Sequence, residues 1–175
     1  QADLKTFSAF GVYGASVIVA LTAQNTHGVQ GVHPVPADFV AQQMTSVLSD
    51  LDVGAIKTGM LATAEIVETV VAGLAQAAGR PLVVDPVMVA TSGDVLLDPN
   101  AVDAVRRRLL PIATVITPNV PEAAVLLGSA QAKTETEVIA QAKALLDLGA
   151  RAVLVKGGHG SDNTGPCSAE ETNCH

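Results

Sequence analysis

Residues 81–88 read PLVVDPVM, a short apolar run that passes directly into an Asp-Pro pair. Such a run is typical of a buried strand, and the Asp-Pro pair is typical of the turn that ends it. The same order, an apolar run followed by polar residues, recurs at residues 113–122 and 152–158. Longer stretches with apolar residues at helical spacing lie between these runs. This alternation predicts an α/β fold with a mostly parallel sheet, right-handed crossovers and helices on both faces.

The remaining elements follow from apolar spacing and from residues that start or stop helices. We expect strands at 55–58, 81–85, 113–117 and 152–156, and helices at 39–52, 64–78, 100–110, 122–127 and 134–148. Near the start, 4–10 is typical of the end of a helix, 14–23 of a buried core strand, and 29–35 of a short edge or flap strand. Residues 1–159 are thus expected to form one core domain, followed by an irregular polar tail at 160–175.

Composition narrows the class of partner. The chain is 49% hydrophobic and has a formal net charge of −7, which disfavours nucleic acid and anionic membranes as partners and favours small molecules. The longest nearly apolar stretch, 15–23, falls far short of the ~20 residues that a bilayer span needs. Both cysteines, Cys167 and Cys174, follow the core, so the core has no disulfide framework and a cytoplasmic location is expected.

Polar residues that directly follow strands are the best candidates for chemistry, because ligands of open parallel sheets bind beyond the carboxyl ends of the strands. Three sets qualify: Asp85; Asn119 with Glu122; and Lys156 with Gly157 and Gly158. The first two sets offer hard oxygen ligands suited to Mg²⁺, and the third offers a cation and backbone N–H groups suited to phosphate. Simpler alternatives stay open, because Asp-Pro is a common turn and Asn119 with Glu122 is typical of a helix capping box.

Several motifs together resemble a known family. They are QADLKTF at 1–7, LTAQNT at 21–26, KTGML at 57–61, DPVM at 85–88, TPNVPE at 117–122 and VKGGH at 155–159. In this order they resemble the hydroxymethylpyrimidine phosphate kinases of thiamine biosynthesis, which belong to the ribokinase-like superfamily. The resemblance implies a Rossmann-like three-layer sandwich that transfers phosphate from ATP, with Mg²⁺, to 4-amino-5-hydroxymethyl-2-methylpyrimidine and its monophosphate.

The resemblance also assigns roles to residues at matching positions. It implies that the pyrimidine is bound by Asp3, Gln24, Met60 and Val87, the nucleotide and its phosphates by Asp85, Asn119, Lys156, Gly157 and Gly158, and the metal by Asp85 and Glu122. A glutamine amide can pair with the donor and acceptor atoms of an aminopyrimidine, and a methionine thioether packs well against a flat ring. Without the resemblance, Gln24 is equally typical of a loop residue, and Met60 and Val87 are more typical of plain core.

The sequence departs from the family at two places. Members begin with a strand and a Gly/Ser-rich loop before the position of Gln1, so we expect a chain cut from a longer protein and an incomplete fold. Members also carry a Gly-Thr-Gly-Cys turn at a helix N-terminus; NTGPCSA at 163–169 echoes it only faintly, because Pro166 lacks an N–H, which makes Cys167 a very weak catalytic candidate. Losing one such donor costs about 10²–10³ in turnover, so weak or no activity is expected.

Other functions remain open at this point. The chain is also compatible with a non-catalytic pyrimidine-binding relative and, within the same superfamily, with a pyridoxal kinase. Kinases of this group are commonly dimers, and the strand expected at 29–35 offers an edge for pairing between two copies.

Overall fold

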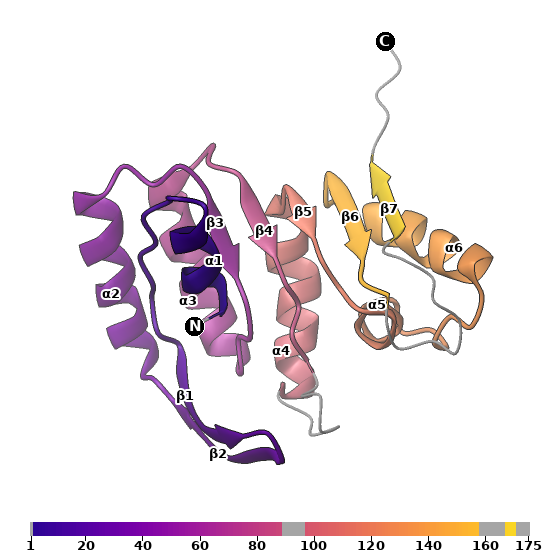
Figure 1. The fold of residues 1–175 in the computed structure, drawn as a ribbon, viewed down its shortest axis with the longest axis horizontal. Coiled ribbons are helices and arrows are strands. Elements are labelled where there is room, and N and C mark those ends of the chain that lie inside the picture. The colour runs from indigo at the N-terminus through magenta and orange to yellow at the C-terminus, as the bar shows by residue number, and fades with distance from the viewer. Residues whose placement is uncertain (1, 89–96, 158–166, 171–175) are drawn as a thin grey trace.

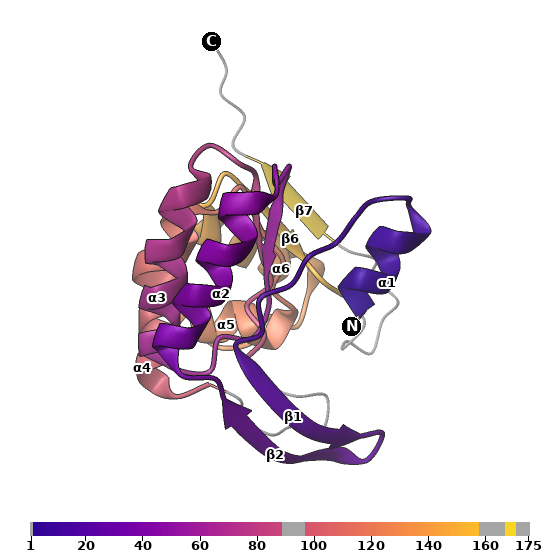
Figure 2. The ribbon, with the colours of Figure 1, turned by 90° about the vertical axis from the view of Figure 1, so that its left-hand side faces the viewer.

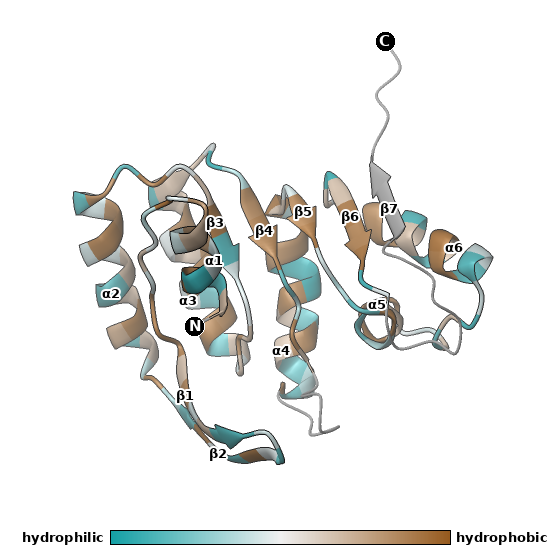
Figure 3. Cartoon of the chain, in the orientation of Figure 1, coloured by the Kyte–Doolittle hydropathy of each residue, from teal (hydrophilic) through white to brown (hydrophobic). Residues whose placement is uncertain are grey.

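A five-stranded sheet forms the centre of the computed structural model, which describes residues 2–88, 97–157 and 167–170. Its strands, in spatial order, are β3 (Ile56–Thr58), β4 (Leu82–Val84), β5 (Val115–Ile116), β6 (Ala152–Val155) and β7 (Cys167–Glu170). The first four are parallel, and β7 runs antiparallel to β6 at the edge (Figure 1). Figure 3 shows hydrophobic residues along β4, β5 and β6. The predicted α/β fold with a mostly parallel sheet is confirmed.

Helices connect the parallel strands and cover the sheet. They are α2 (Ala37–Asp50), α3 (Ala64–Leu74) with a 3₁₀ turn at Ala75–Ala77, α4 (Pro99–Ala104), α5 (Val120–Leu127) and α6 (Glu135–Leu146). Figure 2 shows α2, α3 and α4 on one side of the sheet and α1 (Ala2–Ala9) on the other. None of the residues of α1 is buried. No helix in the described part of the chain has the length and apolar character needed to cross a membrane.

Local signals account for the helix ends. Thr134 Oγ1 accepts the Glu137 N–H while the Glu137 carboxylate accepts the Thr134 N–H, so the predicted capping box of α6 is confirmed. The helix expected at 100–110 begins with Asp98 as its cap and passes from α4 into a π-helical turn at Val105–Leu109 and a 3₁₀ turn at Leu110–Ile112. Pro111 explains this loosened end, because it has no N–H to continue regular α-helical bonding.

Close packing joins α2 to α3. A Cβ atom at Gly73 would lie 2.6 Å from the Met44 sulfur, so a larger residue at this position of α3 would force the flexible end of the Met44 side chain to shift. The apolar core continues through Val67 and Val70 of α3 to Val84 and Ile116 of the sheet. These residues pack α3 against the sheet, whose carboxyl edge carries the polar residues.

The prediction of a buried core strand at 14–23 is wrong. Strand β1 begins only at Ala20 (Ala20–Asn25), is largely exposed, and pairs with β2 (Gly28–Pro34) in a separate antiparallel ribbon. An apolar run predicts burial only where other elements cover it, and within the described residues β1 pairs with β2 alone. The shorter flap strand expected at 29–35 is confirmed as β2. Before the ribbon, the Gln43 side chain holds the chain by accepting the Ile18 N–H and donating to the Ile18 carbonyl.

The expectation of an irregular tail at 160–175 is wrong for Cys167–Glu170, which form β7. These residues lack an apolar period, yet the free edge of β6 supplies backbone partners, with Val155 opposite Cys167 and Ala152 opposite Glu170. An edge strand of this kind needs backbone pairing more than it needs an apolar face. Residues 160–166 and 171–175 lie outside the described residues.

Candidate active site

The carboxyl edge of the sheet collects the polar residues that the sequence singled out. Backbone bonds extend the strands to reach them: the Asp85 N–H donates to the Thr58 carbonyl at 3.0 Å, and the Lys156 N–H donates to the Pro118 carbonyl at 2.8 Å. A parallel bridge also places Asn119 beside Lys156. The prediction that the residues after β4, β5 and β6 share one edge is therefore confirmed, although this geometry does not test their roles.

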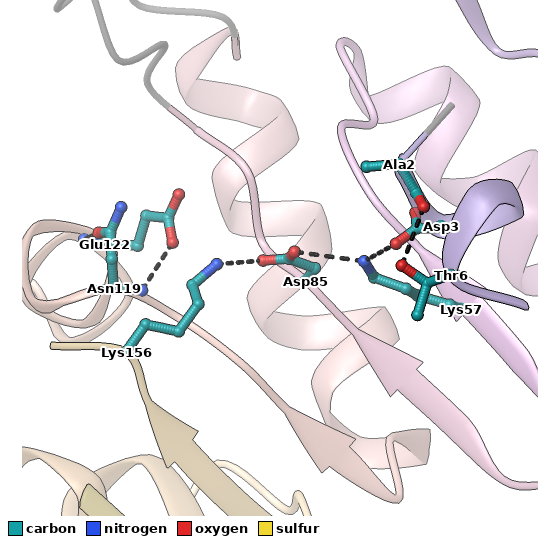
Figure 4. A network of polar contacts seen from close by, with 8 residues as sticks. All are labelled: Ala2, Asp3, Thr6, Lys57, Asp85, Asn119, Glu122 and Lys156. Atoms are coloured by element: carbon teal, nitrogen blue, oxygen red, sulfur yellow. Dashed lines mark hydrogen bonds and ion pairs between the residues drawn. The ribbon is translucent and has the colours of Figure 1, made fainter. Parts of the chain in front are cut away.

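A chain of alternating charges crosses this edge (Figure 4). Lys156 Nζ lies 2.7 Å from Asp85 Oδ1, Lys57 Nζ lies 3.6 Å from Asp85 Oδ2, and Lys57 Nζ also lies 2.5 Å from Asp3 Oδ1. Only 17% of the Asp85 side chain is exposed, so its charge is balanced mainly by the two lysines. Asp85 therefore does more than end a strand in a turn.

Lys57 belongs to this series of charged residues, although the sequence reasoning did not select it as a site residue. It is the middle residue of β3, between Ile56 and the buried Thr58. A charged side chain inside a three-residue strand of a largely apolar sheet is the signal that identifies it, because such a charge needs a nearby partner.

Asn119 and Glu122 form the capping box that was left open as an alternative. Asn119 Oδ1 accepts the Glu122 N–H, and Glu122 Oε2 accepts the Asn119 N–H, both at 2.8 Å. Burial raises the pKa of Glu122 above its ordinary value, and the backbone N–H groups of Asn119 and Met88 together with the charge of Lys156 oppose that rise. The capping box is confirmed, while a role of Glu122 in metal binding stays a prediction.

The residues expected at the pyrimidine end are only partly brought together. Asp3 joins the charged chain through Lys57, whereas Gln24 lies exposed on β1, where its amide oxygen accepts a bond from Thr22 at 3.5 Å. Figure 1 shows the ribbon that carries Gln24 projecting from the carboxyl-edge side of the sheet. Met60 and Val87 are half-buried, and Met60 packs against the core. No contact within the described residues links Gln24 to the charged chain.

The structure describes one of the two expected glycines and only the backbone of the expected cysteine. Gly157 is half-buried directly after Lys156, and Gly158 lies outside the described residues. The backbone of Cys167 begins β7 and pairs with Val155. Cys167 therefore lies in a strand, which differs from the turn at a helix N-terminus that a catalytic cysteine of the resembled type occupies.

The donor set of the edge suits a metal ion that is shared with a ligand. Within the described residues, no group of three or more His, Cys, Asp or Glu side chains is placed to enclose a metal by itself. Asp85 and Glu122 are nevertheless hard oxygen donors, and Mg²⁺ is usually held by one or two carboxylates together with waters and substrate phosphates. These residues fit Mg²⁺ that arrives with a nucleotide better than a resident metal cage.

A family model and the known relatives of this sequence point to the same protein family. Residues 1–172 match the family described as phosphomethylpyrimidine kinase. The hydroxymethylpyrimidine/phosphomethylpyrimidine kinase of Salmonella typhimurium is 55% identical over 166 residues, and the chain spans 62% of the length of that protein while 95% of the chain is matched.

Two solved structures show the same arrangement of elements. The phosphomethylpyrimidine kinase of Clostridium difficile matches with a TM-score of 0.89 at 39% identity, covering 98% of this chain and 74% of that one. An ADP complex of Bacillus subtilis pyridoxal kinase matches with a TM-score of 0.83 at 32% identity, covering 99% of this chain and 70% of that one.

Proposed function

This chain belongs to the phosphomethylpyrimidine kinase family, and we propose that it phosphorylates 4-amino-5-hydroxymethyl-2-methylpyrimidine and its monophosphate, using ATP and Mg²⁺, on the route to thiamine. The observation that carries the proposal is the convergence of Asp85, Asn119 and Lys156 at one edge of the sheet. Phosphoryl transfer depends mainly on positioning and on charge neutralisation, and this edge supplies both cations and carboxylates.

Lys156 is the proposed phosphate-binding cation. Its ammonium group lies 2.7 Å from Asp85, which holds the side chain over the end of β5. An ammonium can exchange one oxygen anion for another at little cost, so the phosphate oxygens of a nucleotide can take the place of Asp85. The Asp85 carboxylate is then available to a divalent cation.

Asn119 and Glu122 extend the same end of the proposed site. The Asn119 carbonyl oxygen is used in the capping box, which leaves its NH₂ group as a donor toward phosphate. Glu122 is bonded through Oε2 and would contact a metal most easily through a bound water. Mg²⁺, when bound, bridges and neutralises phosphate oxygens.

The pyrimidine is proposed to bind on the α1 side of the edge. Asp3 supplies a carboxylate that can accept from the 4-amino or hydroxymethyl group, and Met60 and Val87 supply half-buried apolar contacts for the ring. Gln24, on the exposed β1–β2 ribbon, would complete the pyrimidine site in this proposal.

Two alternative functions remain part of the proposal. A pyridoxal kinase is favoured by the similarity to the B. subtilis enzyme, and a non-catalytic pyrimidine-binding protein is favoured by the strand position of Cys167. Calorimetric titration of the chain with hydroxymethylpyrimidine and with pyridoxal separates the ring preferences. A coupled ADP-release assay with Mg·ATP then separates the enzyme from the non-catalytic protein.

Each outcome of these measurements has a clear meaning. Tighter binding of hydroxymethylpyrimidine than of pyridoxal, with ADP release that requires the pyrimidine, supports the proposed function. Tighter binding of pyridoxal supports the second kinase, and pyrimidine binding without ADP release supports the non-catalytic protein. Failure to bind either ring at millimolar concentration contradicts the ring-binding part of the proposal.

The proposal includes a cytoplasmic location and a homodimer. Support for the dimer comes from the β1–β2 ribbon, which has open backbone edges within the described residues and is largely exposed. Pairing of one such edge with that of a second copy is a common way to join two sheets.

A further inference from the structure

Lys57 is the only lysine of the described residues that forms ion pairs with two carboxylates. Its ammonium group lies 2.5 Å from Asp3 Oδ1 and 3.6 Å from Asp85 Oδ2. Asp3 belongs to α1 and Asp85 follows β4, so one side chain of β3 joins two elements that are far apart in the sequence (Figure 4).

The pair with Asp3 holds an otherwise weakly anchored helix. No side chain of α1 is buried, and among the hydrogen bonds of the described residues this pair alone connects an α1 side chain to the sheet. Without Lys57, the half-exposed Asp3 carboxylate would sample several rotamers, and ordering it on binding would cost free energy. Lys57 therefore fixes where this carboxylate points.

We propose that Lys57 is a positioning residue that orients Asp3 for the pyrimidine and ties it to Asp85 at the phosphate end. This inference rests on the proposed function, in which Asp3 binds the ring and Asp85 serves the phosphates. An ammonium group has three N–H donors and can contact both carboxylates at once. Because Asp3 uses Oδ1 for Lys57, its Oδ2 remains able to accept from the pyrimidine.

The lengths of the two contacts predict an asymmetry. The Asp3 contact is the shorter of the two, so removal of the Lys57 charge disturbs the pyrimidine end more than the phosphate end. A merely structural loss, in which the edge loosens as a whole, would weaken the binding of both ligands alike.

The test is a double-mutant cycle on pyrimidine affinity. Titration calorimetry with hydroxymethylpyrimidine is run on the wild type, Lys57→Met, Asp3→Asn and the double variant, with circular dichroism melting as a check of folding. Lys57→Met weakens binding about two- to fivefold, as expected for a partly exposed ion pair, and Lys57→Arg restores most of the affinity. The double variant binds no more weakly than Asp3→Asn alone, because Lys57 acts through Asp3.

The test has two control measurements, and the results that overturn the role of Lys57 differ from those that overturn the proposed function. Lys143→Met, on the exposed side of α6, keeps the wild-type affinity, and Lys57→Met changes Mg·ADP affinity less than pyrimidine affinity. Multiplicative losses in the double variant, or an unchanged affinity in Lys57→Met, overturn the role of Lys57 while the proposed function stands. A wild type that does not bind the pyrimidine overturns the proposed function, and the role of Lys57 falls with it.

Discussion

Lys156 Nζ lies 2.7 Å from Asp85 Oδ1, although their strands, β6 and β4, are separated by β5. Neighbouring strands lie about 4.8 Å apart, so the lysine reaches across roughly 10 Å of sheet edge to make this contact. The pair thus lies directly over the end of β5, close to Asn119. In the proposed kinase, this is the place that receives the phosphates.

Asp85 should matter for stability as well as for binding. Asp85→Asn leaves the nearby ammonium groups of Lys57 and Lys156 without a shared anion at a poorly exposed position. We expect a loss of about 1–2 kcal/mol in the free energy of unfolding, measured by urea denaturation. Asp52→Asn is the matched control, because its pair with Arg80 is highly exposed and should contribute little. Equal losses in the two variants would contradict the importance of the charged chain.

Glu122 should make stability depend on pH. Its pKa is raised from 4.5 by burial, so the folded state binds more protons than the unfolded state between 4.5 and the folded pKa. The free energy of unfolding therefore falls as the pH rises through this window. Glu122→Gln removes this term while keeping an acceptor for the cap. Unfolding measured between pH 4 and 7 should show the variant gaining stability relative to the wild type as the pH rises.

Glu137 is the opposite case and serves as the control for Glu122. Backbone N–H groups of Lys133 and Thr134 lower its pKa from 4.5, so its contribution to stability is present above 4.5 and is lost as the pH falls through the folded pKa. Glu137→Gln should therefore lose stability relative to the wild type as the pH rises. Parallel pH profiles for the two variants would show that this account of their environments is wrong.

The cap of α6 gives a prediction that is independent of function. Thr134→Ala removes the side chain that accepts the Glu137 N–H and should lower the free energy of unfolding by about 1 kcal/mol. Thr69→Ala is a suitable control, because the Thr69 hydroxyl only donates to a carbonyl within α3. Chemical denaturation should show a clear loss for the first variant and a change within about 0.5 kcal/mol for the second.

Exposed apolar side chains concentrate in the first part of the chain. Eight of the ten large hydrophobic residues exposed among the described residues fall within 4–39, and Phe10 and Tyr13 are 81% and 85% exposed. Exposed apolar side chains in this number favour association between copies. Sedimentation velocity should show concentration-dependent association that Phe10→Ser and Tyr13→Ser reduce and that Ile112→Ser, elsewhere on the surface, does not. A monomer at every concentration would contradict this prediction.

Local signals explain how much of the fold could be predicted from the sequence. The parallel strands and the caps at Thr134 and Asn119 depend on residues a few positions apart, so pattern reasoning finds them. The strand at β2 could be predicted, but its pairing with β1 in a separate ribbon and the strand β7 could not, because both depend on which edges remain open in the folded chain. Gln43 interrupts the apolar stripe of α2 because its amide binds the backbone of Ile18, a contact that no spacing rule reveals.

Some features of the candidate site could also be predicted from the sequence, and others could not. Asp85, Asn119 and Lys156 were found because each follows a strand in an α/β sheet. Their connection was not predictable, because Lys156 and Asp85 are 71 residues apart and Lys57 and Asp3 are 54 apart. The partnership of Lys57 emerges only when the register of β3 and the position of α1 are both known.

The most direct test of the central claim is the affinity of the chain for Mg·ADP, measured by titration calorimetry in the wild type and in Lys156→Met. If the edge at Asp85 and Lys156 receives nucleotide phosphates, the variant binds Mg·ADP at least about tenfold more weakly, as expected for a lost charge-assisted contact. Its affinity for the free pyrimidine stays within about twofold of wild type, because the proposed pyrimidine site at Asp3, Met60 and Val87 does not include Lys156. Equal Mg·ADP affinity in the wild type and Lys156→Met would contradict the claim.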